Sequence, residues 1–266
     1  MHMTESPDTL AHADRLLDSG AFIAAGELYV AVLQKQPDNA EAWCRLGEVY
    51  HCLGQPDQAT GCYRRALALQ PDFVKALSNL GLALLQGGNA REAVPPLREA
   101  VGLRPEVAEI HNNLGMALAS QGDQKQAVVH FRQAVRLKPD LAAAHNNLGL
   151  ALAAQGLPDE ALACYERAVQ LAPANVGALA NLANACKDQG CLGEAVSRYR
   201  QALALQPGNA QLHSNLLLTL NYAPGAEPLE TLREARQYAE RHAAPLASTV
   251  PPPPLRSAAQ RRLRIG

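Results

Sequence analysis

Five asparagines spaced 34 residues apart are the residues in this sequence best suited to a binding chemistry. An asparagine amide both donates and accepts hydrogen bonds, so a row of them can pair with the peptide groups of an extended chain. Asparagine costs up to ~0.7 kcal/mol relative to alanine inside a helix, so five copies need an explanation. We hypothesise a peptide-binding row. The alternatives are hydrogen bonds between neighbouring repeats, or a solvated polar face inherited by duplication. The five are Asn79, Asn113, Asn147, Asn181 and Asn215, and Arg45 stands one interval before them.

Catalytic chemistry has no comparable pattern in the sequence. It contains no HExxH zinc motif, no phosphate-binding loop and no nucleophile elbow. His111, His145 and His213 recur with the same period. Equivalent helices of stacked repeats lie roughly 10 Å apart, too far to share a metal whose ligand bonds are about 2 Å long. We therefore expect structural histidines, and no catalytic residue, metal or cofactor in this chain.

The elements that carry these residues are set by a strict period. Six prolines, from Pro37 to Pro207, stand 34 residues apart without a slip. A fixed period of 20–50 residues is typical of stacked repeats. The clearest copy, Ala142–Asn175, has Leu-Gly, Ala, an aromatic residue, Ala and Pro at set offsets. This pattern resembles the tetratricopeptide repeat, and the resemblance implies an all-α, right-handed superhelical solenoid of antiparallel helix pairs.

Position within the repeat predicts which way each residue faces. If the proline is position 32, the repeats begin at residues 6, 40, 74, 108, 142 and 176, and a final helix begins at 210. At 100° per residue, positions 4, 7, 8 and 11 of the first helix face the second helix. Position 6, which holds the asparagines, lies about 150° from their centre, on the predicted concave face. Position 9 lies on the same face, and either packs against the next repeat or offers an apolar surface to a ligand. It holds Leu82, Met116, Leu150 and Leu218, with Asn184 interrupting them.

The composition restricts the partners and the compartment. The chain has 24 basic and 25 acidic residues, a formal net charge of −1, which argues against general binding of nucleic acid. It has no apolar run of ~18 residues and no secretory signal, so we expect no membrane partner. The six cysteines show no CxxC spacing, and we expect reduced thiols in a cytoplasmic protein.

Three regions are predicted. Residues 6–222 carry six full repeats and a final first helix. Residues 223–247 connect to the tail, with one amphipathic helix expected over Pro228–Ala244. Residues 248–266 form a proline-rich linker and a basic tail.

The tail carries a more specific resemblance. Residues 213–222, the helix with Arg236 and residues 239–243, and Arg262–Gly266 resemble the end of the repeat region and the first catalytic strand of bacterial protein O-GlcNAc transferases of the SPINDLY type. The resemblance implies the substrate-recognition arm of an enzyme that uses UDP-GlcNAc, with its catalytic domain missing from this chain. It also implies that the asparagine row grips protein substrates.

Two other functions remain open at this stage. One is a stand-alone adaptor for protein or peptide clients in extended conformation. Adaptors that clamp a terminal carboxylate use a basic pair at positions 2 and 6, but here those positions read Lys75/Asn79 and Glu109/Asn113. The other is an assembly scaffold or homodimer that uses its convex surface.

Overall fold

A computed structural model describes residues 6–223 and 227–243, which contain fourteen α-helices, one short π-helical turn and no strand. The all-α prediction is confirmed, and thirteen helices fall between Ser6 and Tyr222 as the period requires. The helices are α1 (Ser6–Asp18), α2 (Phe22–Lys35), α3 (Ala40–Cys52), α4 (Pro56–Leu69), α5 (Val74–Gln86), α6 (Ala90–Leu103), α7 (Ala108–Ser120), α8 (Gln124–Leu137), α9 (Ala142–Ala154), α10 (Pro158–Leu171), α11 (Val176–Asp188), α12 (Leu192–Leu205), α13 (Ala210–Tyr222) and α14 (Pro228–Tyr238), followed by the π-helical turn η1 (Ala239–Ala243).

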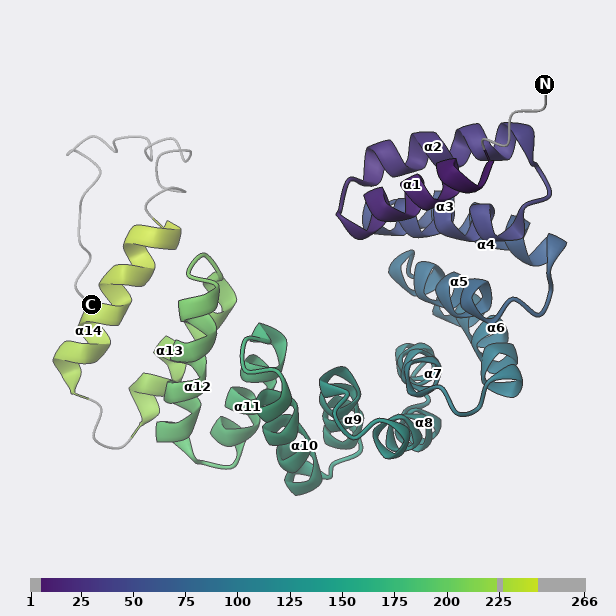
Figure 1. The fold of residues 1–266 in the computed structure, drawn as a ribbon. Helices are drawn as coiled ribbons and strands as arrows, with labels where there is room; N and C mark the ends of the chain where they lie inside the picture. Colours follow the sequence, from purple (N-terminus) through teal and green to yellow (C-terminus); the bar gives the residue numbers. More distant parts are fainter. Residues whose placement is uncertain (1–5, 224–226, 244–266) are drawn as a thin grey trace, which may run out of the picture. The chain divides into compact units, whose positions relative to one another are not determined.

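The chain divides by contact density into two units, Met1–Pro173 and Ala174–Gly266, which we describe separately. In the first unit the two helices of each repeat pack against each other, and the odd-numbered helices share one side (Figure 1). There α1 contacts α3, α3 contacts α5, α5 contacts α7, and α7 contacts α9. Among the described residues of this unit, successive second helices make no comparable contacts with one another. The first helices therefore form the inner layer of this unit.

In four repeats, close packing of the two helices depends on a glycine at position 8, which is Gly47, Gly81, Gly115 or Gly149. A Cβ atom built on Gly115 would lie 2.6 Å from Cε1 of Phe131 on the second helix. Real Cβ atoms essentially never come so close, so the missing side chain lets the two helices approach. The glycine at position 15 has a different role: in six repeats its φ lies between 70° and 87°, the left-handed region that ends the first helix.

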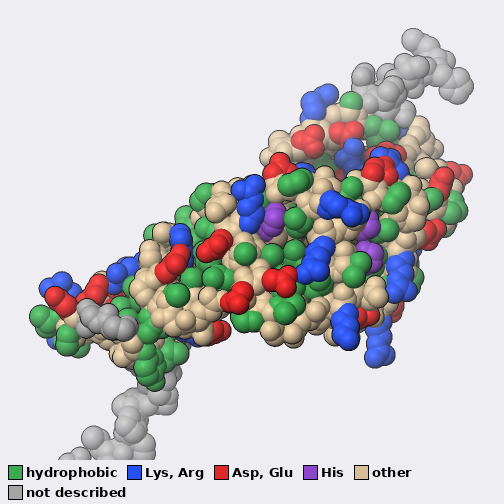
Figure 2. Space-filling model, turned by 90° about the horizontal axis from the view of Figure 1, so that it is seen from below, with side chains coloured by type: hydrophobic (Ala, Val, Ile, Leu, Met, Phe, Trp, Pro, Cys, Tyr) green, Lys and Arg blue, Asp and Glu red, His purple; other side chains and the backbone are tan. Residues whose placement is uncertain are grey.

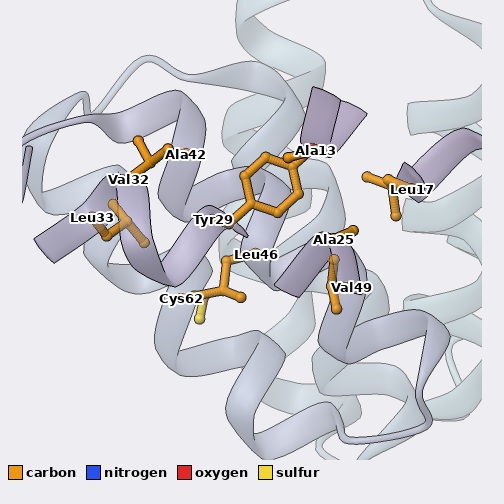
Figure 3. Close-up of a cluster of buried hydrophobic side chains, with 10 residues drawn as sticks. All are labelled: Ala13, Leu17, Ala25, Tyr29, Val32, Leu33, Ala42, Leu46, Val49 and Cys62. Atoms are coloured by element: carbon orange, nitrogen blue, oxygen red, sulfur yellow. The ribbon is translucent and has the colours of Figure 1, made fainter. Parts of the chain in front are cut away.

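The core of the first unit begins with a cluster contributed by α1 to α4 (Figure 3). Tyr29 lies at its centre and is fully buried. Its hydroxyl donates a hydrogen bond to Oδ1 of Asp14 at 2.6 Å, so the ring fills the core while its polar end is satisfied. The large residue at position 24 and the small residue at position 8 together set the distance between the helices of each repeat.

In the second unit, α14 packs on α13 without burying any of its own side chains. Helical residues run from Pro228 to Ala243, where one amphipathic helix was predicted, but α14 ends at Tyr238 and the chain continues directly as η1. The wider π turn places the ring of His242 against α13, with Nε2 3.2 Å from Nδ1 of His213. The predicted linker and tail, residues 248–266, lie outside the described residues.

Candidate peptide-binding groove

Three of the five predicted asparagines lie on the inner helices α5, α7 and α9 of the first unit. Asn113 is buried, and Asn79 and Asn147 are half-buried. Each donates its Nδ2 to a side-chain oxygen of the preceding repeat, so the hydrogen bonds between repeats that the sequence left as an alternative are present. The acceptors are Glu48 Oε1 for Asn79 at 3.2 Å, Ser78 Oγ for Asn113 at 3.1 Å and Asn112 Oδ1 for Asn147 at 3.0 Å.

Arg45 occupies the same position in the repeat before Asn79 and makes the same kind of contact. Its Nε lies 3.5 Å from Oδ1 of Asp14, which is on the preceding repeat. It also pairs within α3 with Glu41 at 3.0 Å and Glu48 at 3.2 Å. The position-6 side chain therefore contacts the preceding repeat in four successive repeats. It is charged in the first of these, Arg45, and an amide in the other three.

The remaining two asparagines lie in the second unit, where each is half-buried. Asn215 on α13 accepts a hydrogen bond from Nε2 of Gln211 at 3.0 Å, within its own helix. Position 5 of the preceding repeat is Ala180, which offers no side-chain acceptor. Asn181 lies on α11. Their binding of a peptide, like that of the other three, stays a prediction.

The acceptors at position 5 are the feature that sequence reasoning missed. Ser78 and Asn112 each precede the asparagine that donates to them by 35 residues, so the polar partner was visible one repeat earlier in the sequence. The signal was weak because a polar residue beside an asparagine also fits a solvated helix face.

Several cavities open in the first unit, one of them lined by Ser78, Asn79 and Glu109, and two others occupy equivalent positions in the repeat. The first, about 380 Å³, is lined by Leu17, Asp18, Phe22, Glu48, His51, Cys52, Tyr63, Lys75, Asn79 and Leu82. The second, about 210 Å³, is lined by Met116, Ala119, Ser120, Gln124, Phe131, Asn147, Leu150 and Ala151. Both lie between positions 9, 12 and 13 of one repeat and positions 6 and 9 of the next, with the position-24 aromatic ring behind. They are the same site, repeated two repeats apart.

The apolar residues of position 9 border these cavities. Leu82 lines the first, while Met116 and Leu150 line the second. Leu150 is 46% exposed, so packing against the next repeat does not cover it. Leu218 is 49% exposed at the same position in the second unit. These leucines form exposed apolar contacts beside the asparagines.

The recurring histidines serve the repeat stacking. Nε2 of His111 lies 3.1 Å from the carbonyl oxygen of Pro105, and Nε2 of His145 lies 3.0 Å from that of Pro139. Since a carbonyl oxygen only accepts, Nε2 carries the proton in both rings. Trp43 at the same position donates its indole N–H to the carbonyl of its own preceding proline at 2.8 Å. His111 and His145 therefore have the structural role expected of them.

His213 departs from that pattern. Its ring is fully buried, with Nε2 3.0 Å from Oε1 of Glu234 on α14 and Nδ1 facing His242. The two ring nitrogens point to different partners, so the group ties α14 and η1 to α13.

The cysteines are all free. Burial raises the pKa of Cys44 to about 12 and that of Cys62 to about 11. Both thiols are therefore protonated at neutral pH, and neither offers a reactive thiolate.

The surface gives further information about partners. On the face shown in Figure 2, acidic and basic side chains are interspersed and apolar side chains lie between them. A nucleic-acid-binding face usually carries a stripe of one sign. Among residues 6–223 and 227–243, no helix is long and apolar enough to cross a membrane.

Comparison with family models gives three matches, all to tetratricopeptide repeats. Residues 31–140 match the tetratricopeptide domain of cytochrome c-type biogenesis protein H, and residues 142–175 and 178–211 match two tetratricopeptide-repeat models. No curated protein matches the chain.

Among the solved structures with similar folds, three match different shares of this chain. MamA is 27% identical, with a TM-score of 0.54 over 60% of this chain and 93% of that one. TTC0263, a thermophilic tetratricopeptide protein of Thermus thermophilus, is 26% identical, with a TM-score of 0.59 over 68% and 99%. PilW, a type IV pilus biogenesis factor, is 20% identical, with a TM-score of 0.72 over 80% and 99%, and shows the fold alone. None of these matches supports the transferase family that the tail resembles.

Proposed function

We propose that this chain, a tetratricopeptide-repeat protein, is a protein-interaction scaffold that holds an extended segment of a client against the inner side of its first unit. The observation that carries the proposal is the repeated cavity, present beside Asn79 and again beside Asn147. Each copy combines an amide with an exposed or half-exposed apolar side chain. A stand-alone adaptor is favoured over a transferase arm, because the alignment with this chain takes in 93–99% of the similar structures above.

The asparagine amides support a role in binding even though one donor of each is used between repeats. The Oδ1 atoms of Asn79, Asn113 and Asn147 accept no hydrogen bond from other described residues. An amide oxygen of this kind can accept from a backbone N–H of a client. An extended chain presents such donors at regular intervals, whereas a helix uses its own.

The cavities also favour a segment over a folded surface. Each is a separate hollow in the 200–400 Å³ range, suited to single side chains that project from a chain lying along the first helices. Recognition by main-chain hydrogen bonds, with pockets for some of the side chains, is a common way to bind an extended peptide.

The test begins with selection of random linear peptides, displayed on phage, against the full chain. The affinity of the enriched peptides is then measured by fluorescence anisotropy. Leu150→Asp places a charge at the second cavity and should weaken binding at least tenfold. Val129→Asp is the matched control, because Val129 is 58% exposed on the second helix α8. It should leave the affinity unchanged.

Circular dichroism must show that both variants keep their helical content. If Val129→Asp abolishes binding and Leu150→Asp does not, the binding surface is the outer one and the proposal is wrong. If no linear peptide is enriched, the extended-segment part of the proposal fails.

A further inference from the structure

The two copies of the inner cavity differ in charge, and this difference specifies the client. The residues that line the first cavity include two acids, Asp18 and Glu48, and one base, Lys75, a formal charge of −1. The residues that line the second cavity carry no charge. An occupant that spans both cavities meets an acidic site at one end and an apolar site at the other.

Most of the charge at the first cavity is neutralised within the protein. Glu48 is only 18% exposed and contacts Lys75 Nζ at 2.6 Å and Arg45 Nη1 at 3.2 Å, besides the amide of Asn79. Asp14 is held by Tyr29 and Arg45. Glu48 is part of the cavity wall and its carboxylate is occupied, while Asp14 lies outside the wall.

Asp18 is different, because its carboxylate is exposed and makes no ion pair or hydrogen bond with the other described residues. It is the last residue of α1, where the helix dipole disfavours a negative charge. The side chain therefore contributes nothing favourable to its own helix, and it lies at the cavity beside the apolar side chains of Phe22 and Leu82.

The distance between the cavities sets a spacing. They occupy equivalent positions two repeats apart, and neighbouring first helices are roughly 10 Å apart, so the centres lie roughly 20 Å apart. An extended chain advances ~3.3 Å per residue, which makes about six residues between the two side chains.

From these observations we infer that the client segment is extended and carries a lysine or arginine in the first cavity and an aliphatic side chain in the second, about six residues away. The stem of the basic side chain lies against Phe22 and Leu82 while its charge faces Asp18. The inference rests on the proposed function and narrows it to one class of peptide.

The test uses fluorescein-labelled nine-residue peptides in a Gly-Ser background, added to the full chain. The first has Lys and Leu six residues apart, and a second has them in the reverse order. A third replaces Lys by Glu, and a fourth shortens the spacing to three residues. The better of the first two should bind about tenfold more tightly than the Glu peptide at low salt, with the difference shrinking as salt rises.

Asp18→Asn should reduce the preference for Lys about three- to fivefold, since exposed ion pairs contribute little. Its thermal midpoint should stay or rise, because a charge unfavourable to α1 is removed. Asp38→Asn, in the exposed loop between α2 and α3, is the matched control and should change neither. The inference would be overturned if the Glu peptide or the short peptide bound as tightly as the better Lys peptide, or more tightly. Loss of that binding in Leu150→Asp would still support the scaffold. Absence of binding by all four peptides, when library peptides bind, would also overturn it.

Discussion

The hydrogen bond between Asn147 and Asn112 allows the role of the asparagine row to be measured directly. Nδ2 of Asn147 on α9 lies 3.0 Å from Oδ1 of Asn112 on α7, so the bond joins two repeats. We predict that Asn147→Ala and Asn112→Ala, made singly and together, show a favourable coupling between the two side chains.

The size of the coupling follows from two terms. A neutral hydrogen bond contributes a net ~0.5–1.5 kcal/mol, while replacing asparagine by alanine in a helix gains up to ~0.7 kcal/mol. Either single variant therefore changes the free energy of unfolding by about 1 kcal/mol or less, and its sign alone decides nothing. In a double-mutant cycle the helix term appears in the single and double variants alike and cancels. The coupling that remains should be ~0.5–1.5 kcal/mol.

Urea unfolding followed by circular dichroism supplies the four free energies. The matched cycle pairs Asn147 with Ser78, which lies two repeats away and makes no contact with it. That coupling should be near zero. If the Asn112–Asn147 coupling is also near zero, the hydrogen bond does not stabilise the stacking of the repeats. The free energy that asparagine costs in a helix would then be explained by client binding and not by stacking.

Two further predictions concern packing and pH. Gly115→Ala should destabilise the chain because the new Cβ meets Phe131 at 2.6 Å, whereas Gly61→Ala, with no atom within 4 Å, should stabilise it by ~0.5–1 kcal/mol in urea unfolding. His213 should make the second unit lose stability as pH falls below about 6.5. Burial lowers its pKa despite the opposing effect of Glu234, so the unfolded chain binds more protons. Hydrogen exchange of α13 and α14 at pH 5 and 7.5 should show the loss, and His213→Gln should reduce it.

The helices could be predicted from sequence because their signals are local and repeated. A glycine with positive φ and a proline at fixed offsets mark the helix ends in each repeat, and Gly115 faces Phe131 as positions 8 and 24 require. The π-helical turn at the end of the last helix was not predicted. Pro228–Ala243 has the apolar spacing of a regular helix, and the π turn depends on His242 meeting a buried ring of another helix. Such a contact leaves no mark in the local sequence.

The candidate site was predicted in part, since its geometry depends on which atoms of one repeat meet the next. Helical periodicity predicted the direction in which the position-6 side chain points. The hydrogen bond made by its amide depends on an acceptor in the preceding repeat, which the periodicity does not give. Ser78 provides that acceptor for Asn113, whereas Ala180 provides none for Asn215. The charge difference between the two cavities was missed because Asp18 belongs to the first, least regular repeat, where the repeat pattern gives no guide to which side chains reach the groove.

The two halves of the amide are compatible with both the observed stacking and the proposed peptide binding at one residue. In Asn79, Asn113 and Asn147 the N–H₂ group is used between repeats, which fixes the side-chain orientation and directs Oδ1 away from that bond. A fixed acceptor binds a backbone N–H with less loss of side-chain entropy than a free one. The stacking bonds would then prepare the groove for a chain that presents N–H groups, and the two cavities would choose among such chains by their side chains.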